Sequence, residues 1–83
     1  MDFNDTMKIN IEFDKSREVR EIVTNVYEAL KVKGYDPISQ IVGYILSGDP
    51  TYITSYGGAR GMIVKIERDE LLEEFVKKYI ETL

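Results

Sequence analysis

The sequence contains no cysteine and no histidine among its 83 residues. These absences exclude disulfides, thiolate nucleophiles, Ser–His triads and zinc sites built from cysteine and histidine. Carboxylates, lysines, tyrosines and hydroxyls remain for catalysis, but their spacing along the chain matches no catalytic cluster. We therefore expect a protein that is not an enzyme and that uses neither a metal nor another cofactor.

Positive charge and long apolar runs are also scarce. Lys and Arg number 11 against 15 Asp and Glu, which gives a formal net charge of −4. An acidic chain binds phosphate backbones and anionic membranes poorly. No apolar run approaches the roughly 18 residues of a membrane-spanning helix, and no secretory signal opens the chain. The sequence thus predicts a cytoplasmic protein that binds neither nucleic acid nor membranes.

Proline occurs only twice, and each time it follows an aspartate. In both dipeptides, at 36–37 and 49–50, the aspartate can cap a helix whose first residue is the proline. Residues 37–47 carry apolar side chains at helical spacing, and Gly48 can end this helix in the left-handed conformation. We expect a largely buried helix here, followed by a shorter one that ends at about Tyr52.

Apolar residues at i, i+3, i+4 and i+7 spacing predict three further helices, at about residues 14–33, 59–66 and 69–80. Residues 54–58 have the composition of a loop. The apolar stripe of the first helix comprises Val19, Ile22, Val23, Val26 and Leu30. The predicted fold is all-α: a compact small bundle of four to five helices in a domain that spans residues 14–83.

The first 13 residues have a different pattern. Between Met7 and Phe13 every second residue is apolar, and a period of two is typical of an extended segment with one apolar face. An alternative is a disordered tail in which the alternation is accidental. We expect residues 1–13 to form an extended or flexible N-terminal arm.

A domain of this size has a marginal core, so association with a second copy often stabilises it. A glycine in the middle of a helix costs about 1 kcal/mol relative to alanine, which indicates close packing of Gly43 against another backbone. We place the core of a homodimer on Ile41, Gly43, Tyr44 and Ile45. Four tyrosines fit either a core with hydroxyls at its rim or a protein–protein interface: Tyr35, Tyr44, Tyr52 and Tyr56.

Two other runs could hold ligands, and each has a plainer interpretation. Residues 57–61 are glycine-rich like a phosphate-binding loop, but no preceding strand and no P-loop lysine accompany them, so we interpret them as a flexible loop. The carboxylates of residues 67–74 could bind a cation. Their spacing matches no calcium loop and fits a solvated helix N-terminus.

Thr6 lies in the arm between Asp5 and Met7. From the residues alone it is an ordinary hydroxyl. The alternative is a kinase acceptor, because a threonine in an unstructured arm can enter a kinase cleft without unfolding anything. Phosphorylation would add a charge of about −1.5 to −2 beside acidic side chains.

Three runs together resemble one known family: KGYDPISQIVGYILSGDPTYI at residues 33–53, the pair Ala59-Arg60, and ERDELLEEFVKKYI at residues 67–80. On these residues the chain is similar to the IreB/ReoM family of small cytoplasmic regulators. The resemblance implies a helical homodimer without enzymatic activity. It also implies phosphorylation by a membrane-bound Ser/Thr kinase with extracellular PASTA repeats, and Thr6 occupies the place of the acceptor in the arm.

The resemblance further implies control of cell-wall synthesis. Family members promote degradation of the UDP-N-acetylglucosamine enolpyruvyl transferase of the peptidoglycan pathway by the Clp protease, and phosphorylation relieves this restraint. We assign Arg60, Lys65 and Arg68 to a partner surface. Two rival functions are a helical nucleic-acid-binding module, which the acidic charge disfavours, and a plain structural dimerisation domain.

The chain departs from the family pattern next to these basic residues. Thr54 and Ser55 stand where family members carry a proline and a basic residue, and Gly57-Gly58 replaces two asparagines. Val64 replaces a further basic residue. If the basic side chains contact a partner, this member binds that partner more weakly or binds a different one.

Overall fold

The computed structural model describes the backbone of residues 3–83 and the side chains of residues 15–83. The all-α fold class is confirmed, because the backbone contains no strand in that range. The elements in chain order are α1 (Phe3–Val32), α2 (Pro37–Ser47), the 3₁₀ helices η1 (Pro50–Tyr52) and η2 (Tyr56–Gly58), α3 (Ala59–Ile63) and α4 (Arg68–Glu81).

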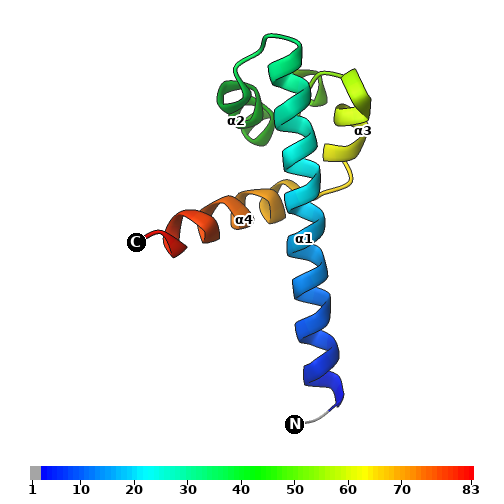
Figure 1. The fold of residues 1–83 in the computed structure, drawn as a ribbon, viewed down its shortest axis with the longest axis vertical. Helices are drawn as coiled ribbons and strands as arrows, with labels where there is room; N and C mark the ends of the chain where they lie inside the picture. Colours follow the sequence, from blue (N-terminus) through cyan, green and yellow to red (C-terminus); the bar gives the residue numbers. More distant parts are fainter. Residues whose placement is uncertain (1–2) are drawn as a thin grey trace.

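Helix α1 is the axis of the molecule (Figure 1). Its 30 residues span about 45 Å at 1.5 Å per residue, most of the 49 Å longest dimension. Helices α2 and α3 and the two 3₁₀ helices surround the C-terminal half of α1. Helix α4 crosses α1 near its middle and then projects away, so that the C-terminal end of α4 stands apart from the other helices.

The length of α1 follows from a sequence without helix breakers. Gly34 is the first glycine and Pro37 the first proline of the chain, and each residue added to a nucleated helix gains a backbone hydrogen bond. The expected extended segment at Met7–Phe13 is therefore wrong, since α1 begins at Phe3 and continues through these residues. The division between an arm, residues 1–13, and a body stays a prediction.

The two Asp-Pro pairs start helices as the sequence predicts. The carboxylate of Asp36 accepts a hydrogen bond from the backbone N–H of Ile38, and Gly48 ends α2 with a left-handed φ of 73°. At η1, the Thr51 hydroxyl and backbone N–H donate to Asp49 Oδ1 at 2.7 and 3.0 Å. These hydrogen bonds hold the pKa of Asp49 below its ordinary value.

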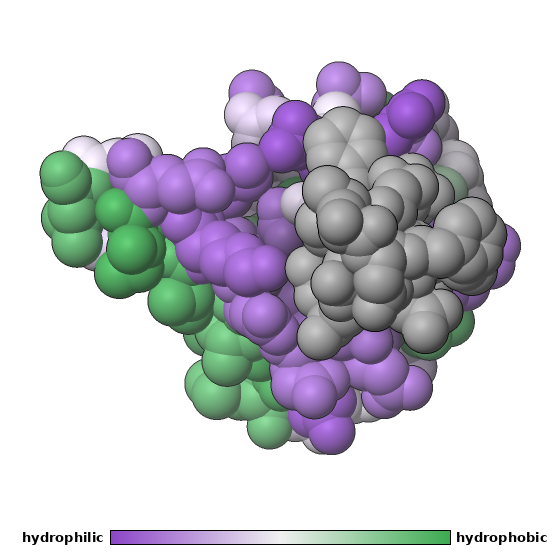
Figure 2. Space-filling model, turned by 90° about the horizontal axis from the view of Figure 1, so that it is seen from below, coloured by the Kyte–Doolittle hydropathy of each residue, from purple (hydrophilic) through white to green (hydrophobic). Residues whose placement is uncertain are grey.

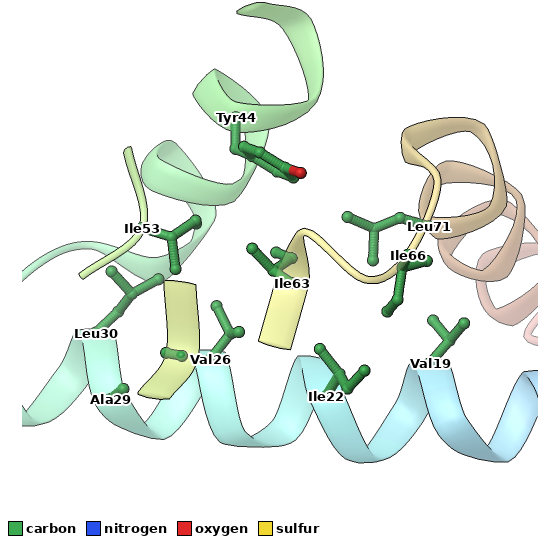
Figure 3. Close-up of a cluster of buried hydrophobic side chains, with 11 residues drawn as sticks. Val19, Ile22, Val26, Ala29, Leu30, Tyr44, Ile53, Ile63, Ile66 and Leu71 are labelled. Carbon is green, nitrogen blue, oxygen red and sulfur yellow. The ribbon is translucent and has the colours of Figure 1, made fainter. Parts of the chain in front are cut away.

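The core lies between α1 and the helices that surround it (Figure 3). The stripe predicted on α1 is confirmed, with Val23 at its edge and the other four residues buried. Facing this stripe are buried side chains from the later elements: Tyr44, Ile53, Ala59, Ile63, Ile66 and Leu71. One layer of apolar contacts along α1 therefore holds all the later elements in place.

Helix α2 differs from the prediction of a largely buried helix. Ile38 is 75% exposed and Leu46 is 79% exposed, whereas Tyr44, which lies off the apolar stripe, is 5% exposed. Helix α2 is apolar on more than one side, but a small domain offers it one core to pack against. One apolar side of α2 therefore remains on the surface.

Candidate interaction surface

A row of exposed apolar side chains runs along α4. The row has the spacing of one helix face, and we refer to it as the α4 stripe: Leu72, Val76, Tyr79, Ile80 and Leu83. In Figure 2 the projecting α4 has a hydrophobic side and a hydrophilic side. An apolar face that the monomer leaves uncovered is the common mark of a binding surface for another protein.

A second exposed row, the α2 stripe, comprises Ile38, Val42 and Leu46. Beside it, a groove of about 760 Å³ lies between α1, α2 and α4. Its apolar lining includes Val23, Tyr27, Ile38, Ile41, Val42 and Phe75. The groove extends from Ile38 and Val42 of the α2 stripe to Phe75 of α4.

The four residues that we assigned to a dimer core lie at different depths. Tyr44 is buried in the core of the monomer, and Ile41 and Ile45 are partly buried against that core. Ile41 also lines the groove. Within the single chain, the nearest neighbour of Gly43 is the aromatic ring of Tyr52, and packing of Gly43 against the backbone of a second copy stays a prediction.

The contact between Gly43 and Tyr52 fixes η1 against α2. A Cβ atom at position 43 would overlap the Tyr52 ring. The side chain of Gln40 adds a second link, since its Nε2 donates to the Tyr52 carbonyl oxygen at 2.8 Å. Glycine at this position thus serves packing within one chain, a role that the sequence pattern did not distinguish from packing between chains.

We predict that Gly43→Leu lowers the free energy of unfolding by about 1–3 kcal/mol, because the new side chain displaces the Tyr52 ring. The matched control is Gly61→Leu in α3, where a Cβ meets no atom within 4 Å and the change stays below about 1 kcal/mol. Urea titration of both variants measures the difference. Equal stability of the two variants would exclude the packing role of Gly43.

Two of the three basic residues that we assigned to a partner surface bind backbone carbonyls. Arg60 Nε donates to the Ile53 oxygen at 2.8 Å, and Arg68 Nη1 donates to the Ile45 oxygen at 2.9 Å. Arg68 thereby ties the start of α4 to the end of α2. Lys65 is exposed. Neither contact has a signal in the sequence, because the acceptor is a backbone carbonyl, a group that every residue carries.

Polar contacts hold α4 on α1 at the crossing. The hydroxyl of Ser16 donates to Oε1 of the buried Glu74 at 2.8 Å. The ammonium of Lys15 lies 3.0 Å from Glu70 Oε2, and the hydrogen bond and charge of Glu70 raise the pKa of Lys15. This junction has no signal in the sequence, since nothing in the pattern pairs residues 15 and 16 with the carboxylates of α4.

The tyrosines and Thr6 complete the set of predicted residues. Tyr44 is the buried one of the four tyrosines, whereas Tyr35 and Tyr56 are half exposed and Tyr35 lines the groove. Thr6 lies in the first turns of α1, and its side chain is outside the described residues. In the part of the chain that the structure describes, no helix is both long enough and apolar enough to span a bilayer.

Comparison with known proteins places the chain in a family. Residues 4–81 match the family model described as IreB regulatory phosphoprotein. A UPF0297 protein of Acetivibrio thermocellus is 60% identical over 81 residues, which cover 98% of this chain and 90% of the relative. A UPF0297 protein of Ruminiclostridium cellulolyticum is 56% identical over 81 residues, which cover 98% of this chain and 92% of the relative. The chain belongs to the IreB regulatory phosphoprotein family.

Proposed function

We propose that this protein is a non-catalytic, dimeric adaptor whose activity is switched by phosphorylation of Thr6. The observation that carries the proposal is the match of residues 4–81 to a family of regulatory phosphoproteins. A regulator of this kind acts through the surfaces that it presents to other proteins. The exposed stripes of α2 and α4 are surfaces of the kind that such a role requires.

The proposed dimer forms through the α4 stripe and the groove beside the α2 stripe. Both surfaces are largely apolar, and the ion pair between Glu73 and Lys77 borders the α4 stripe. Association of two copies would remove these apolar side chains from water. It would thereby add to the small core that one copy can form.

The proposed switch is electrostatic. Thr6 lies near the start of α1, where Asp5 already contributes negative charge. A phosphate adds a charge of about −1.5 to −2 and three acceptor oxygens, which repel acidic surfaces and attract arginine. The modified arm would therefore contact the body or a partner differently from the unmodified arm.

The proposed target is the first committed step of peptidoglycan precursor synthesis. In its unmodified form the protein would bring the UDP-N-acetylglucosamine enolpyruvyl transferase to the Clp protease, and phosphorylation would stop this delivery. Lys65 offers an exposed positive charge for a partner, and Arg60 and Arg68 lie on the same part of the chain. These assignments rest on the family resemblance and on the exposed basic groups.

The kinase step is tested with the cytoplasmic kinase domain of a PASTA-repeat Ser/Thr kinase from the bacterium that produces this protein. We expect the full chain to take up phosphate on Thr6, located by mass spectrometry of proteolytic fragments. The variant Thr6→Ala should lose that modified fragment. If the kinase phosphorylates another substrate but leaves Thr6 unmodified, the proposed switch is wrong.

A further inference from the structure

Most serine and threonine hydroxyls between residues 15 and 83 donate a hydrogen bond. Ser16 donates to Glu74, Ser39 to Asp36, and Thr51 to Asp49. The other donors bond to backbone oxygens on their own helix or turn: Thr24, Ser47 and Thr82. Such hydroxyls are already engaged, so a kinase must break their hydrogen bonds before it can modify them.

Ser55 differs from these residues. It is exposed, and within the described side chains its hydroxyl makes no hydrogen bond, including none to the short helix η2 that it precedes. Its neighbour Thr54 accepts a hydrogen bond from the backbone N–H of Tyr56 at 3.2 Å. Among the serines and threonines between residues 15 and 83, Ser55 is therefore the exposed one whose hydroxyl makes no hydrogen bond.

Open space lies beside two glycines of the loop that carries Ser55. Gly57 and Gly58 follow it with φ values of 61° and 76°, and a Cβ built at either glycine meets no atom within 4 Å. Tyr56 is half exposed. Left-handed glycines give the backbone freedom to change its course, as an acceptor segment does when it lies extended in a kinase cleft.

The base of the loop is rigid. Ile53 and Ala59, on either side of the loop, are fully buried, and the backbone N–H of Arg60 donates to the Thr54 oxygen at 3.1 Å. The loop itself holds two backbone hydrogen bonds, from Gly58 N–H to the Ser55 oxygen at 3.1 Å and from Ala59 N–H to the Tyr56 oxygen. Opening the loop would break this exposed turn and leave the core in place.

Two cations lie beside the loop. The Lys33 ammonium is 5.8 Å from the centroid of the Tyr56 ring, and Arg60 reaches back to the Ile53 oxygen. A dianion on Ser55 would therefore stand in a loop that has positive charge nearby. Charge-assisted hydrogen bonds from lysine or arginine to phosphate are among the stronger polar contacts in proteins.

We propose that Ser55 is a second phosphorylation site, and this inference rests on the proposed function as a kinase substrate. In the reaction, the Ser55 oxygen forms a bond to the γ-phosphorus of ATP while the bond from that phosphorus to ADP breaks. The hydroxyl proton passes to the catalytic aspartate of the kinase. The phosphate then offsets the positive charge of Lys33 and Arg60 and changes this face of the protein for any partner.

The test uses the full chain with the same kinase domain and ATP, and mass spectrometry locates each phosphate. Four proteins are compared: wild type, Thr6→Ala, Ser55→Ala and the double variant. Ser39→Ala is the control, because its hydroxyl is already bonded to Asp36. We expect Thr6→Ala to retain one phosphate on the fragment that contains Ser55, and the double variant to lose it. The Ser39→Ala protein should carry phosphate at the same positions as the wild type.

Each of the other outcomes contradicts one of the two proposals or both. Phosphate on Thr6 alone, with Ser55 unmodified after prolonged incubation, would overturn the second site and leave the proposed function standing. Phosphate on Ser55 alone would support the second site and contradict the switch at Thr6. An unmodified chain, with the kinase active on another substrate, would overturn both.

Discussion

The variant Leu71→Ala should lose about 2–5 kcal/mol of unfolding free energy. Leu71 lies in the first turn of α4 and is completely buried against the core beneath α1 (Figure 3). Its truncation removes apolar contacts and leaves a cavity that rigid neighbours fill only in part. The total free energy of unfolding of a small domain is about 5–15 kcal/mol, so this loss is a large share of it.

The matched control is Leu72→Ala, one residue along the same helix. Leu72 is 48% exposed and belongs to the α4 stripe, so its truncation removes little core packing. Urea denaturation followed by circular dichroism, repeated at several protein concentrations, measures both variants. We expect the Leu71→Ala loss at every concentration and a Leu72→Ala loss only where the dimer forms. Equal losses at low concentration would contradict the position of α4 on the core.

The second large effect concerns association. Val76→Asp places a charge in the middle of the α4 stripe, and burying an unpaired carboxylate between two copies is strongly unfavourable. We expect the dissociation constant of the dimer to rise about thirtyfold or more, the effect of losing about 2 kcal/mol at an interface hot spot. Analytical ultracentrifugation measures the change.

Val64→Asp is the control for this variant. Val64 and Val76 are both 51% exposed, but Val64 follows α3 and is not part of either stripe. The control should therefore associate like the wild type, and both variants should keep their helical content. A Val76→Asp protein that dimerises as tightly as the Val64→Asp protein would exclude the α4 stripe from the interface.

Local signals in the sequence account for most of the helices. The capping aspartates at 36 and 49 define the starts of α2 and η1 because each cap satisfies backbone N–H groups within two residues. The stripe on α1 was predictable because one helix face contacts nearly all of the core. These features depend on residues that are close together in the sequence and on the helical period of the apolar side chains.

Features that depend on tertiary contacts were not predictable. The apolar spacing of α2 does not reveal which side faces the core. Ile41 and Ile45 are partly buried against the core, whereas Ile38 and Leu46 are exposed. The alternation between Met7 and Phe13 suits a strand only if a partner strand exists. In the structure these residues belong to helix α1. The contacts of Arg60 and Arg68 with carbonyl oxygens likewise arise only once the helices are assembled.

The proposed adaptor function is tested by degradation of the enolpyruvyl transferase in a mixture of purified Clp protease, ATP and this protein. Three forms are compared: the unmodified chain, the chain phosphorylated on Thr6, and kinase-treated Thr6→Ala. We predict rapid loss of the transferase with the first and third forms and slow loss with the second. Degradation at one rate in all three mixtures, or at the rate seen without this protein, would contradict this prediction.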